Sequence, residues 1–347
     1  MFGSTSNKNY DSLASTPSNV TNEVSVDLHL ASTCLRTALE SDNKYSRGVL
    51  GVITGSNSYP GAAILSTRAG AQSNIGMVRY AGPLRAQNLV LQASPEVVAS
   101  EQLSGKIDAI TVGSGIPDHE HCNDESAENQ RKYIESILAQ YSNENYNAET
   151  QTSNNLPPIC VDAGALDLLP KHVFEKVVLT PHAGELSSLF ARYDLEISAQ
   201  QILKNPANYA QKAANLTGAT MLVKGSTTAV ASPNNLRKPI YIAQYGPTWL
   251  ATAGSGDVLA GILGALLAQR EKNSESRTDY GLIAASAAII HGISAVFASR
   301  SSGGNNYTQL VQDMLKAKHP LTLEHPIVAS DIITALPHVL GILINMK

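Results

Sequence analysis

The segment Gly254–Asp257, with the sequence GSGD, combines small residues with one carboxylate in a pattern that suits phosphoryl transfer. The apolar residues that follow it predict a buried helix. The start of a helix has unpaired N–H groups and a partial positive charge, so it can hold a phosphate. Asp257 would lie in the first turn, facing a hydroxyl that attacks this phosphate. In the alternative interpretation Asp257 only complements the helix dipole and the glycines only form a tight turn.

Five further polar clusters each follow a predicted buried strand. In chain order they are Gly55–Ala63, Gly113–Pro117, Asp162–Leu166, Thr180–Glu185 and Lys224–Thr228. Open parallel sheets bind ligands at the carboxyl ends of their strands, and all of these clusters would lie there. Ordinary turn formation could account for one or two polar clusters at strand ends, but it is a poor explanation for all of them. The pattern therefore favours a binding site at this edge of the sheet.

Several residues of these clusters also have a structural interpretation. Asp162 either caps the following helix or belongs to the site, with equal weight. His182 would be an ordinary surface histidine, and Glu185 a first-turn carboxylate even if it also helps to place a metal. Lys224 would simply end a strand, although KGSTT offers a cation, a flexible backbone and three hydroxyls together. His291, in an apolar helix, is interpreted as a core or interface residue rather than a ligand.

The elements that would position these residues alternate between short apolar strands and helices. The predicted strands are residues 49–55, 77–80, 88–93, 109–113, 159–162, 177–180 and 221–224. Helices are predicted at 28–39, 61–74, 282–298 and 331–344, the last with Pro337 inside it. This alternation predicts an α/β fold with a mostly parallel central sheet and helices on both faces.

The chain is predicted to form a single domain, residues 26–347, after a disordered polar tail, residues 1–25. Polar loops are expected at 141–155 and 271–278.

The composition excludes several classes of protein. Of the 347 residues 43% are hydrophobic and 16% charged, as in a soluble enzyme. The net charge of −4 argues against a nucleic-acid partner, which would need clustered Lys and Arg. Cys34, Cys122 and Cys160 match neither a disulfide framework nor a zinc site, which indicates a cytoplasmic protein. No apolar run approaches membrane-spanning length, and no export signal precedes the fold, so no membrane association is expected.

Five segments together resemble motifs of the bacterial ADP-dependent (S)-NAD(P)H-hydrate dehydratases, a family of the ribokinase-like superfamily. The segments are Lys44–Pro83, Val161–Pro170, Leu179–Leu189, Leu222–Val230 and Leu250–Gln269. They follow the order and spacing of the family over roughly residues 30–345. Several motifs matching together are more specific than any one alone, so the resemblance implies a ribokinase-like fold.

The resemblance also implies a reaction, the repair of NADH or NADPH whose nicotinamide ring has been hydrated. The C6 hydroxyl of the S epimer (NADHX or NADPHX) would be phosphorylated by ADP, with Mg²⁺ screening the phosphates. Loss of phosphate would then restore the double bond. Asp257 would be the catalytic base, and the amides of Ala253–Gly256 would stabilise the phosphoryl charge.

The binding residues follow by motif position. The hydrated dinucleotide would contact Ala62, Gly115, His182 and Asp257. ADP, and the AMP formed from it, would contact Lys224, Gly225, Ser226, Thr227, Thr228 and Gly256. No metal ligand is assigned. The chain departs from the family pattern at 113–117, where GSGIP replaces a more glycine-rich turn and Pro117 would stiffen the substrate loop.

The resemblance implies partners as well. Many family members carry a fused epimerase domain that has no counterpart in this sequence, so an NAD(P)HX epimerase on another chain is the expected functional partner. Family members are typically homo-oligomers, and a homotetramer is expected.

Two other classes of function stay open at this point. A small-molecule kinase of the same superfamily, acting on a hydroxyethylthiazole or pyrimidine precursor, would share GSGD but release a phosphorylated product. The TPHAGE and YPGAA segments favour the dehydratases. A non-catalytic adenine-nucleotide-binding protein would not need Asp257. The preference for ADP over ATP depends on the resemblance alone, and the choice between NADHX and NADPHX is left open.

Overall fold

A computed structural model describes residues 22–143, 156–270, 278–300, 316 and 324–346 of the chain. Its strands form one ten-stranded sheet in the order β1-β10-β9-β8-β7-β6-β5-β2-β3-β4. The strands are β1 (Glu23–Ser25), β2 (Val49–Ile53), β3 (Met77–Ala81), β4 (Val98–Ser100), β5 (Ala109–Val112), β6 (Ile159–Val161), β7 (Val177–Leu179), β8 (Thr220–Val223), β9 (Thr228–Ala231) and β10 (Ile240–Ala243).

The sheet is mostly parallel, as the sequence predicts. Among the strands of the described residues, only β9 runs antiparallel to its two neighbours, β8 and β10. Gly51 of β2 pairs in parallel with Arg79 of β3 on one side and with Ile110 of β5 on the other. The carboxyl ends of β2 and β5–β8 therefore lie at one edge, so the loops that follow these strands can build a common site.

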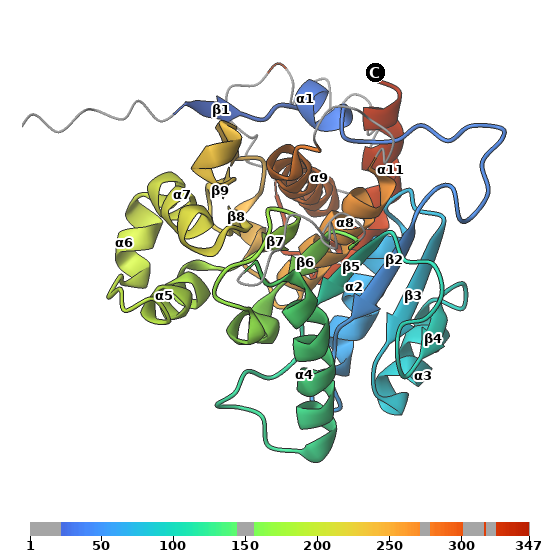
Figure 1. Ribbon diagram of the computed structural model, residues 1–347. Coiled ribbons are helices and arrows are strands. Elements are labelled where there is room, and N and C mark those ends of the chain that lie inside the picture. The colour runs from blue at the N-terminus through green and yellow to red at the C-terminus, as the bar shows by residue number, and fades with distance from the viewer. Residues whose placement is uncertain (1–21, 144–155, 271–277, 301–315, 317–323, 347) are drawn as a thin grey trace, which may run out of the picture.

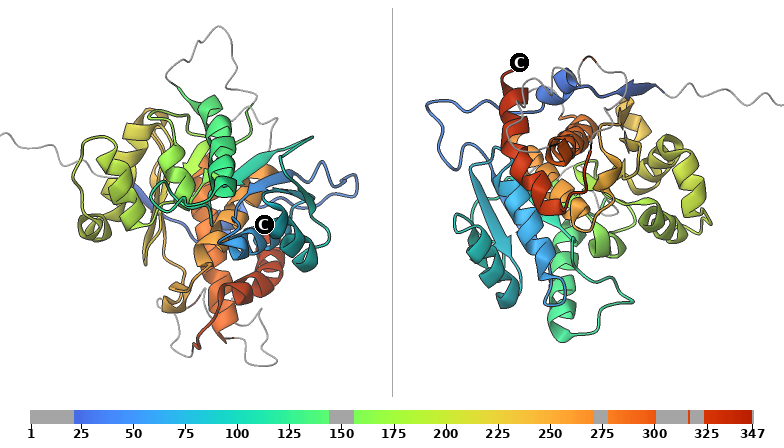
Figure 2. Two further views of the ribbon diagram at one scale, coloured as in Figure 1. Left: turned by 90° about the horizontal axis from the view of Figure 1, so that it is seen from below. Right: turned by 180° about the vertical axis from the view of Figure 1, so that it is seen from behind.

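Helices cover both faces of the sheet (Figures 1 and 2), which confirms the predicted α/β class. One face carries α1 (Leu28–Ser32), α2 (Pro60–Ala71), α3 (Leu84–Ala93), α8 (Ser255–Gln269), α9 (Tyr280–Arg300) and α11 (Ala329–Ile344). The other carries α4 (Glu125–Leu138), η3 (Ala163–Leu168), α5 (Ala183–Ala191), α6 (Ala199–Lys204) and α7 (Pro206–Thr217). In β8, Leu222 packs into the first of these cores, while Met221 and Val223 pack into the second.

Two predicted elements are corrected by the structure. Residues 88–93, predicted as a strand, belong to helix α3. The buried residues of this helix, Ala86 and Val90, lie four positions apart on one helical face, and a window of six residues is too short to reveal that spacing. The helix predicted at 28–39 ends at Ser32. The hydroxyls of Ser32 and Thr33 bond to backbone carbonyls of the preceding turn, which competes with continued helix.

The sheet extends further towards the N-terminus than the sequence predicts. Glu23–Ser25, assigned to the polar tail, form β1 and pair in parallel with β10. An edge strand needs only one neighbouring backbone, so its residues need not be apolar. Residues 1–21 of that tail lie outside the described residues, as do 144–155 and 271–277 of the predicted loops.

Helix α9 is longer and more apolar than expected. By length and composition it could cross a membrane, with a mean hydropathy of 1.9 over its most apolar window, so the prediction that no apolar run approaches that length is wrong. In the structure 94% of this window is buried within the fold, where α9 packs against α8 and α11. The helix therefore forms the centre of the core on its face of the sheet.

Candidate active site

Helix α8 begins with an exposed set of backbone amides. Its N-cap residue, Gly254, has the left-handed conformation (φ 86°), and no side chain caps the helix. A Cβ at this position would lie 2.4 Å from Cδ1 of Leu65. Because the conformation and the space both require glycine, position 254 cannot carry a capping side chain of its own. The N–H of Ser255 donates to the Thr252 carbonyl at 3.3 Å, so a ligand would use the next N–H groups of α8, those of Gly256 and Asp257. An anion would suit these groups best.

Asp257 lies in the first turn of this helix, as predicted. Burial raises the pKa of its carboxyl group to about 7, and the nearby charge of Asp162 acts in the same direction, while the Lys224 cation opposes both. A carboxylate with this pKa exchanges protons close to neutral pH. This property suits a general base better than a structural charge.

Lys224 brings a cation to the same helix start. A Cβ on Gly256 would lie 3.6 Å from the Nζ atom of Lys224. This Nζ is 2.7 Å from Oδ1 of Asp162 and 3.7 Å from Oε2 of Glu185. Although burial disfavours the charged ammonium, these two carboxylates outweigh burial and raise the pKa of Lys224. The cation is therefore permanent and held in place beside the open amides.

Asp162 belongs to the site and is not a helix cap. Its side chain makes no capping hydrogen bond to η3. Instead, its carboxylate accepts hydrogen bonds from Ser114 Oγ and Thr180 Oγ1, each at 2.8 Å, in addition to the ion pair with Lys224. Burial opposes ionisation, but Lys224 and the two hydroxyls together lower the pKa of Asp162. The buried anion fixes Lys224 and raises the proton affinity of Asp257.

His182 and Glu185 cap helix α5. The Nδ1 atom of His182 accepts the backbone N–H groups of Gly184 and Glu185 at 3.0 and 3.2 Å. Glu185 returns the contact, since its Oε2 accepts the backbone N–H of His182 at 2.7 Å. This is a capping box with histidine in the usual place of serine. The first-turn interpretation of Glu185 is correct, and His182 has a structural role besides any contact with a ligand.

A cavity of about 820 Å³, here called the Lys224 cavity, adjoins the start of α8. It brings together most of the residues predicted to bind the nucleotide, namely Lys224, Gly225, Ser226, Thr228 and Gly256, with His182 at its rim. Thr227 does not line the cavity, and its hydroxyl accepts a hydrogen bond from Gln244 Nε2 at 3.2 Å. The apolar part of its lining includes Ala243, Leu250, Leu259 and Ala288.

His291 lines the same cavity, although the sequence interpretation placed it in the core or at an interface. It is buried, and its Nε2 lies 3.3 Å from Oγ of Ser255, the first residue of α8. Burial, aided by the Lys224 charge, lowers the pKa of His291 to about 4, with the Ser255 backbone acting against them. The ring is therefore neutral near the open amides. An apolar run around a histidine hides such a contact from the sequence.

Ala62 and Gly115, both predicted to contact the substrate, lie against each other. A Cβ on Gly115 would be only 2.4 Å from the Cβ of Ala62, and Gly115 has a positive φ of 68°. Ala62 is in α2, the helix that packs against α8. The loop after β5 and the start of α2 thus meet next to the helix that carries Asp257.

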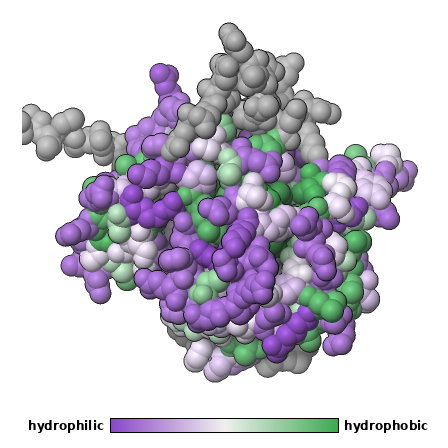
Figure 3. Space-filling view, turned by 60° about the horizontal axis from the view of Figure 1, so that its bottom comes forward, coloured by the Kyte–Doolittle hydropathy of each residue, from purple (hydrophilic) through white to green (hydrophobic). Residues whose placement is uncertain are grey.

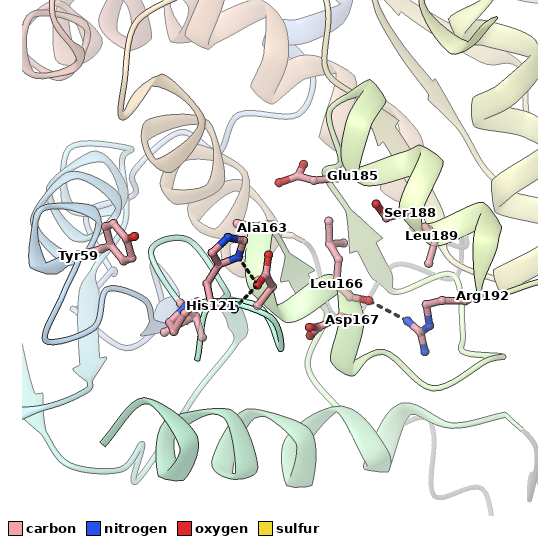
Figure 4. A pocket seen from close by; sticks show the side chains of 13 residues that line it. Tyr59, His121, Ala163, Leu166, Asp167, Glu185, Ser188, Leu189 and Arg192 are labelled. Carbon is pink, nitrogen blue, oxygen red and sulfur yellow. Dashed lines mark hydrogen bonds and ion pairs between the residues drawn. The ribbon is translucent and has the colours of Figure 1, made fainter. Parts of the chain in front are cut away.

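A second cavity, of about 510 Å³, is here called the Arg192 cavity. Its lining includes Ile116 and Tyr59, which lie near Gly115 and Ala62 in sequence, but Ala62, Gly115 and Asp257 line neither cavity. Figure 4 shows Tyr59 on one side of it and four side chains of α5 and its C-cap on the other, with His121 between them. Pro117 also lines it, and the Pro117 carbonyl accepts a hydrogen bond from Arg131 at 2.7 Å.

The face at the lower end of Figure 1 is predominantly hydrophilic (Figure 3).

Within the described ranges, no group of three or more His, Cys, Asp or Glu side chains could hold a metal. Mg²⁺ commonly binds through one or two carboxylates, substrate phosphates and water. Asp162 and Glu185 are already engaged with Lys224 and the cap of α5. The residues therefore fit a magnesium ion held mainly by phosphate oxygens and water.

The fold is ribokinase-like. Two solved structures share the fold over almost the whole chain. An ADP/ATP-dependent NAD(P)H-hydrate dehydratase from Bacillus subtilis, co-crystallised with ATP and Mg²⁺, superposes with a TM-score of 0.65 at 22% identity and covers 90% of this chain and 96% of its own. A ribokinase-like superfamily protein from Enterococcus faecalis V583 superposes with a TM-score of 0.67 at 20% identity, covering 93% and 96%.

Residues 50–317 match the NAD(P)H-hydrate dehydratase family, and the chain belongs to this family. The bifunctional NAD(P)H-hydrate repair enzyme Nnr of Mycobacterium tuberculosis is 36% identical over 243 residues, which are 68% of this chain and 44% of that protein. The ADP-dependent (S)-NAD(P)H-hydrate dehydratase of Neisseria meningitidis serogroup B is 29% identical over 279 residues, 76% and 81% of the two chains. This chain thus spans about half the length of its bifunctional relatives.

Proposed function

We propose that this protein is an enzyme that dehydrates the S epimer of hydrated NADH or NADPH, with ADP as the phosphate donor. The observation that carries the proposal is the position of Asp257, a carboxylate with a pKa near 7 beside an uncapped helix start and a fixed lysine. The family match and the ADP-dependent relative from Neisseria meningitidis support the choice of reaction.

In the first step Asp257 accepts the proton of the C6 hydroxyl of the hydrated ring. The hydroxyl oxygen forms a bond to the β-phosphorus of ADP, and the bond from this phosphorus to the bridging oxygen breaks. AMP leaves with that electron pair. The N–H groups at the start of α8 and the ammonium of Lys224 stabilise the negative charge on the transferring phosphoryl group.

In the second step the phosphorylated ring loses inorganic phosphate. The C6–O bond breaks with help from the lone pair of the ring nitrogen, and the proton on C5 passes to solvent, which restores the C5–C6 double bond. Phosphate is a far better leaving group than hydroxide, so this step needs little acid catalysis. The phosphorylation therefore serves to make the hydroxyl leave.

The two cavities divide the substrates between them. ADP would lie in the Lys224 cavity, with its phosphates at Gly256 and Lys224 and its base against the apolar wall. The reacting ring would lie between Ala62, Gly115 and Asp257, near His182. Magnesium bound to the nucleotide would screen the phosphate charge. We further propose a cytoplasmic homotetramer that depends on an NAD(P)HX epimerase for the S epimer.

A direct assay tests the proposal. The protein is mixed with hydrated NADH or NADPH, magnesium, and either ADP, ATP or no nucleotide, and the absorbance band of the reduced nicotinamide is followed. We expect this absorbance to return with ADP. Failure to return with either nucleotide would overturn the dehydratase function. A stable phosphorylated product would indicate a kinase instead.

A further inference from the structure

We propose that Arg192 binds a phosphate of the hydrated dinucleotide, at the end of the Arg192 cavity away from Lys224. This inference rests on the proposed function and deepens it, because it identifies a residue that selects the phosphorylated part of the substrate. The phosphate is either the pyrophosphate or the 2′-phosphate of the adenosine, and these two sources have the same chemistry.

Helix α5 makes one continuous wall of the cavity. Its lining residues, Glu185, Ser188, Leu189 and Arg192, are spaced i, i+3, i+4 and i+7, which places them on one face of the helix and its C-cap. Glu185 marks the inner end, since it lies 3.7 Å from Lys224. Arg192 follows about two helical turns later, roughly 10 Å farther along the axis at 1.5 Å per residue. A dinucleotide that reacts at one end of this wall spans such a distance.

Arg192 is fixed in position and carries an uncompensated charge. Its Nη1 donates to the carbonyl of Leu166 at 2.8 Å, and its Nη2 donates to the carbonyl of Leu169. Figure 4 shows the first of these bonds, with the half-buried guanidinium at the edge of the cavity. Carbonyl oxygens hold the group in place without neutralising it. Within the part of the chain that the structure describes, Arg192 forms no ion pair with a carboxylate.

The carboxylates of the cavity, by contrast, each have a cationic or capping partner. Asp118 pairs with Nδ1 of His121 at 2.6 Å. Asp167 accepts two hydrogen bonds from Nη2 of Arg131 at 3.0 Å and one from the backbone N–H of His119 at 2.9 Å. Glu185 is shared between the cap of α5 and Lys224. The cavity therefore presents one cation that lacks a counter-charge. Arginine donates to phosphate through a planar fork, which suits this group better than a neutral ligand.

The test compares Arg192→Gln and Arg192→Lys with the wild-type protein, using NADHX and NADPHX as substrates and NADH and NADPH in calorimetric binding titrations. For Arg192→Gln we expect a rise of about tenfold in KM and in the product Kd, at unchanged kcat, because a charge-assisted hydrogen bond is lost away from the reacting atoms. Arg192→Lys retains the charge, so its KM and product Kd should rise less than those of Arg192→Gln.

The outcomes separate the two phosphates. If Arg192→Gln weakens the binding of NADPHX and NADPH but not that of NADHX and NADH, the phosphate is the 2′-phosphate. If it weakens the binding of all four dinucleotides equally, the phosphate is the pyrophosphate. The matched control is Arg270→Gln, which removes another carbonyl-bound guanidinium, bonded to Asp108 and Leu267 at the opposite edge of the sheet. Its KM should stay unchanged. If Arg192→Gln and Arg192→Lys fold but bind both products as the wild type does, the inference is wrong, even if the wild type proves inactive as a dehydratase.

Discussion

Helices α5 and α8 both begin near Lys224, but the first turn of α5 is capped by side chains and that of α8 is not. Each has an acidic residue at the third helical position, Glu185 in α5 and Asp257 in α8. In α5 the ring of His182 and the carboxylate of Glu185 satisfy the backbone N–H groups. In α8 Gly254 supplies no side chain, and Asp257 makes no return bond to the N-cap in the described part of the chain.

This difference separates a structural acid from a reactive one. A capped helix start has already used its N–H groups, so it has little left to offer an anion. An uncapped start leaves both the amides and the carboxylate for a ligand. In both helices the acid lies three residues after the N-cap residue, which is His182 in α5 and Gly254 in α8. This arrangement stabilises the helix in α5 and, in our proposal, serves phosphoryl transfer in α8.

The largest effect is expected for Asp257→Asn. Removal of a general base should lower kcat by about a thousandfold or more, while ADP binding stays within about threefold. The control is Glu185→Gln, which changes the equivalent position of α5 and should leave most of the activity. Full activity in Asp257→Asn would remove the proposed distinction between the two helices.

The same variant should be more stable than the wild type. The pKa of Asp257 is raised from 3.8 to about 7 in the folded protein, so ionisation at higher pH costs folding free energy. The contribution of the protonated acid is complete below the unfolded pKa and is lost as the pH rises through about 7. Asp257→Asn should therefore gain about 4 kcal/mol at alkaline pH and nothing at acidic pH, in denaturant titrations.

Gly254→Ala should damage the open helix start itself. The left-handed backbone costs a residue with a Cβ about 1–2 kcal/mol, and the new methyl would collide with Leu65. As the start of α8 shifts, we expect ADP affinity to fall about tenfold in calorimetry. Gly341→Ala in α11 is the control, because no atom lies within 4 Å of its Cβ position, and it should leave ADP affinity unchanged. Equal affinity in both variants would contradict the role of Gly254.

Asp162→Asn should shift the pH dependence of activity. In the wild type kcat/KM should rise with pH through about 7 as Asp257 ionises. The negative charge of Asp162 raises the pKa of Asp257, so its removal should move the acidic limb of the profile to lower pH by about one unit. Asp42→Asn, which removes a carboxylate paired with Arg36 elsewhere, should cause no shift. A shift to higher pH would show that Asp162 does not act on Asp257.

The smallest effect is expected at the cap of α5. Glu185→Ala removes the acceptor for the His182 N–H and should lower the free energy of unfolding by about 1 kcal/mol. Glu185→Gln keeps a hydrogen-bond acceptor, so its free energy of unfolding should fall less than that of Glu185→Ala. Equilibrium denaturation measures both values. Equal stability of the three proteins would mean that the capping box contributes nothing.

The sequence predicted the sheet class and the edge that carries the site, because parallel strands and their glycine-rich turns have local signatures. The role of Asp162 was ambiguous, since an aspartate after a strand caps a helix as readily as it pairs with a distant lysine. Lys224 is 62 positions away in sequence, and nothing near Asp162 reveals it.

Other features depend on packing and could not be predicted locally. Arg192 has no signature in the sequence, because its cavity forms only where α5 faces the loop after β5. His291 resembled a core residue, and it is one, but its buried ring also reaches the start of α8. The helix at 84–93 was mistaken in part for a strand because a short apolar window fits both periods.

The central claim, that the start of α8 transfers a phosphoryl group to the substrate hydroxyl, is tested most directly with an oxygen label. NADH is hydrated in heavy-oxygen water, so that the C6 hydroxyl carries the label, and is then converted by the enzyme with unlabelled ADP in ordinary water. The account predicts that the label appears in inorganic phosphate, with one AMP formed for each NADH. Label released as water would contradict it, because the hydroxyl would then have left without being phosphorylated.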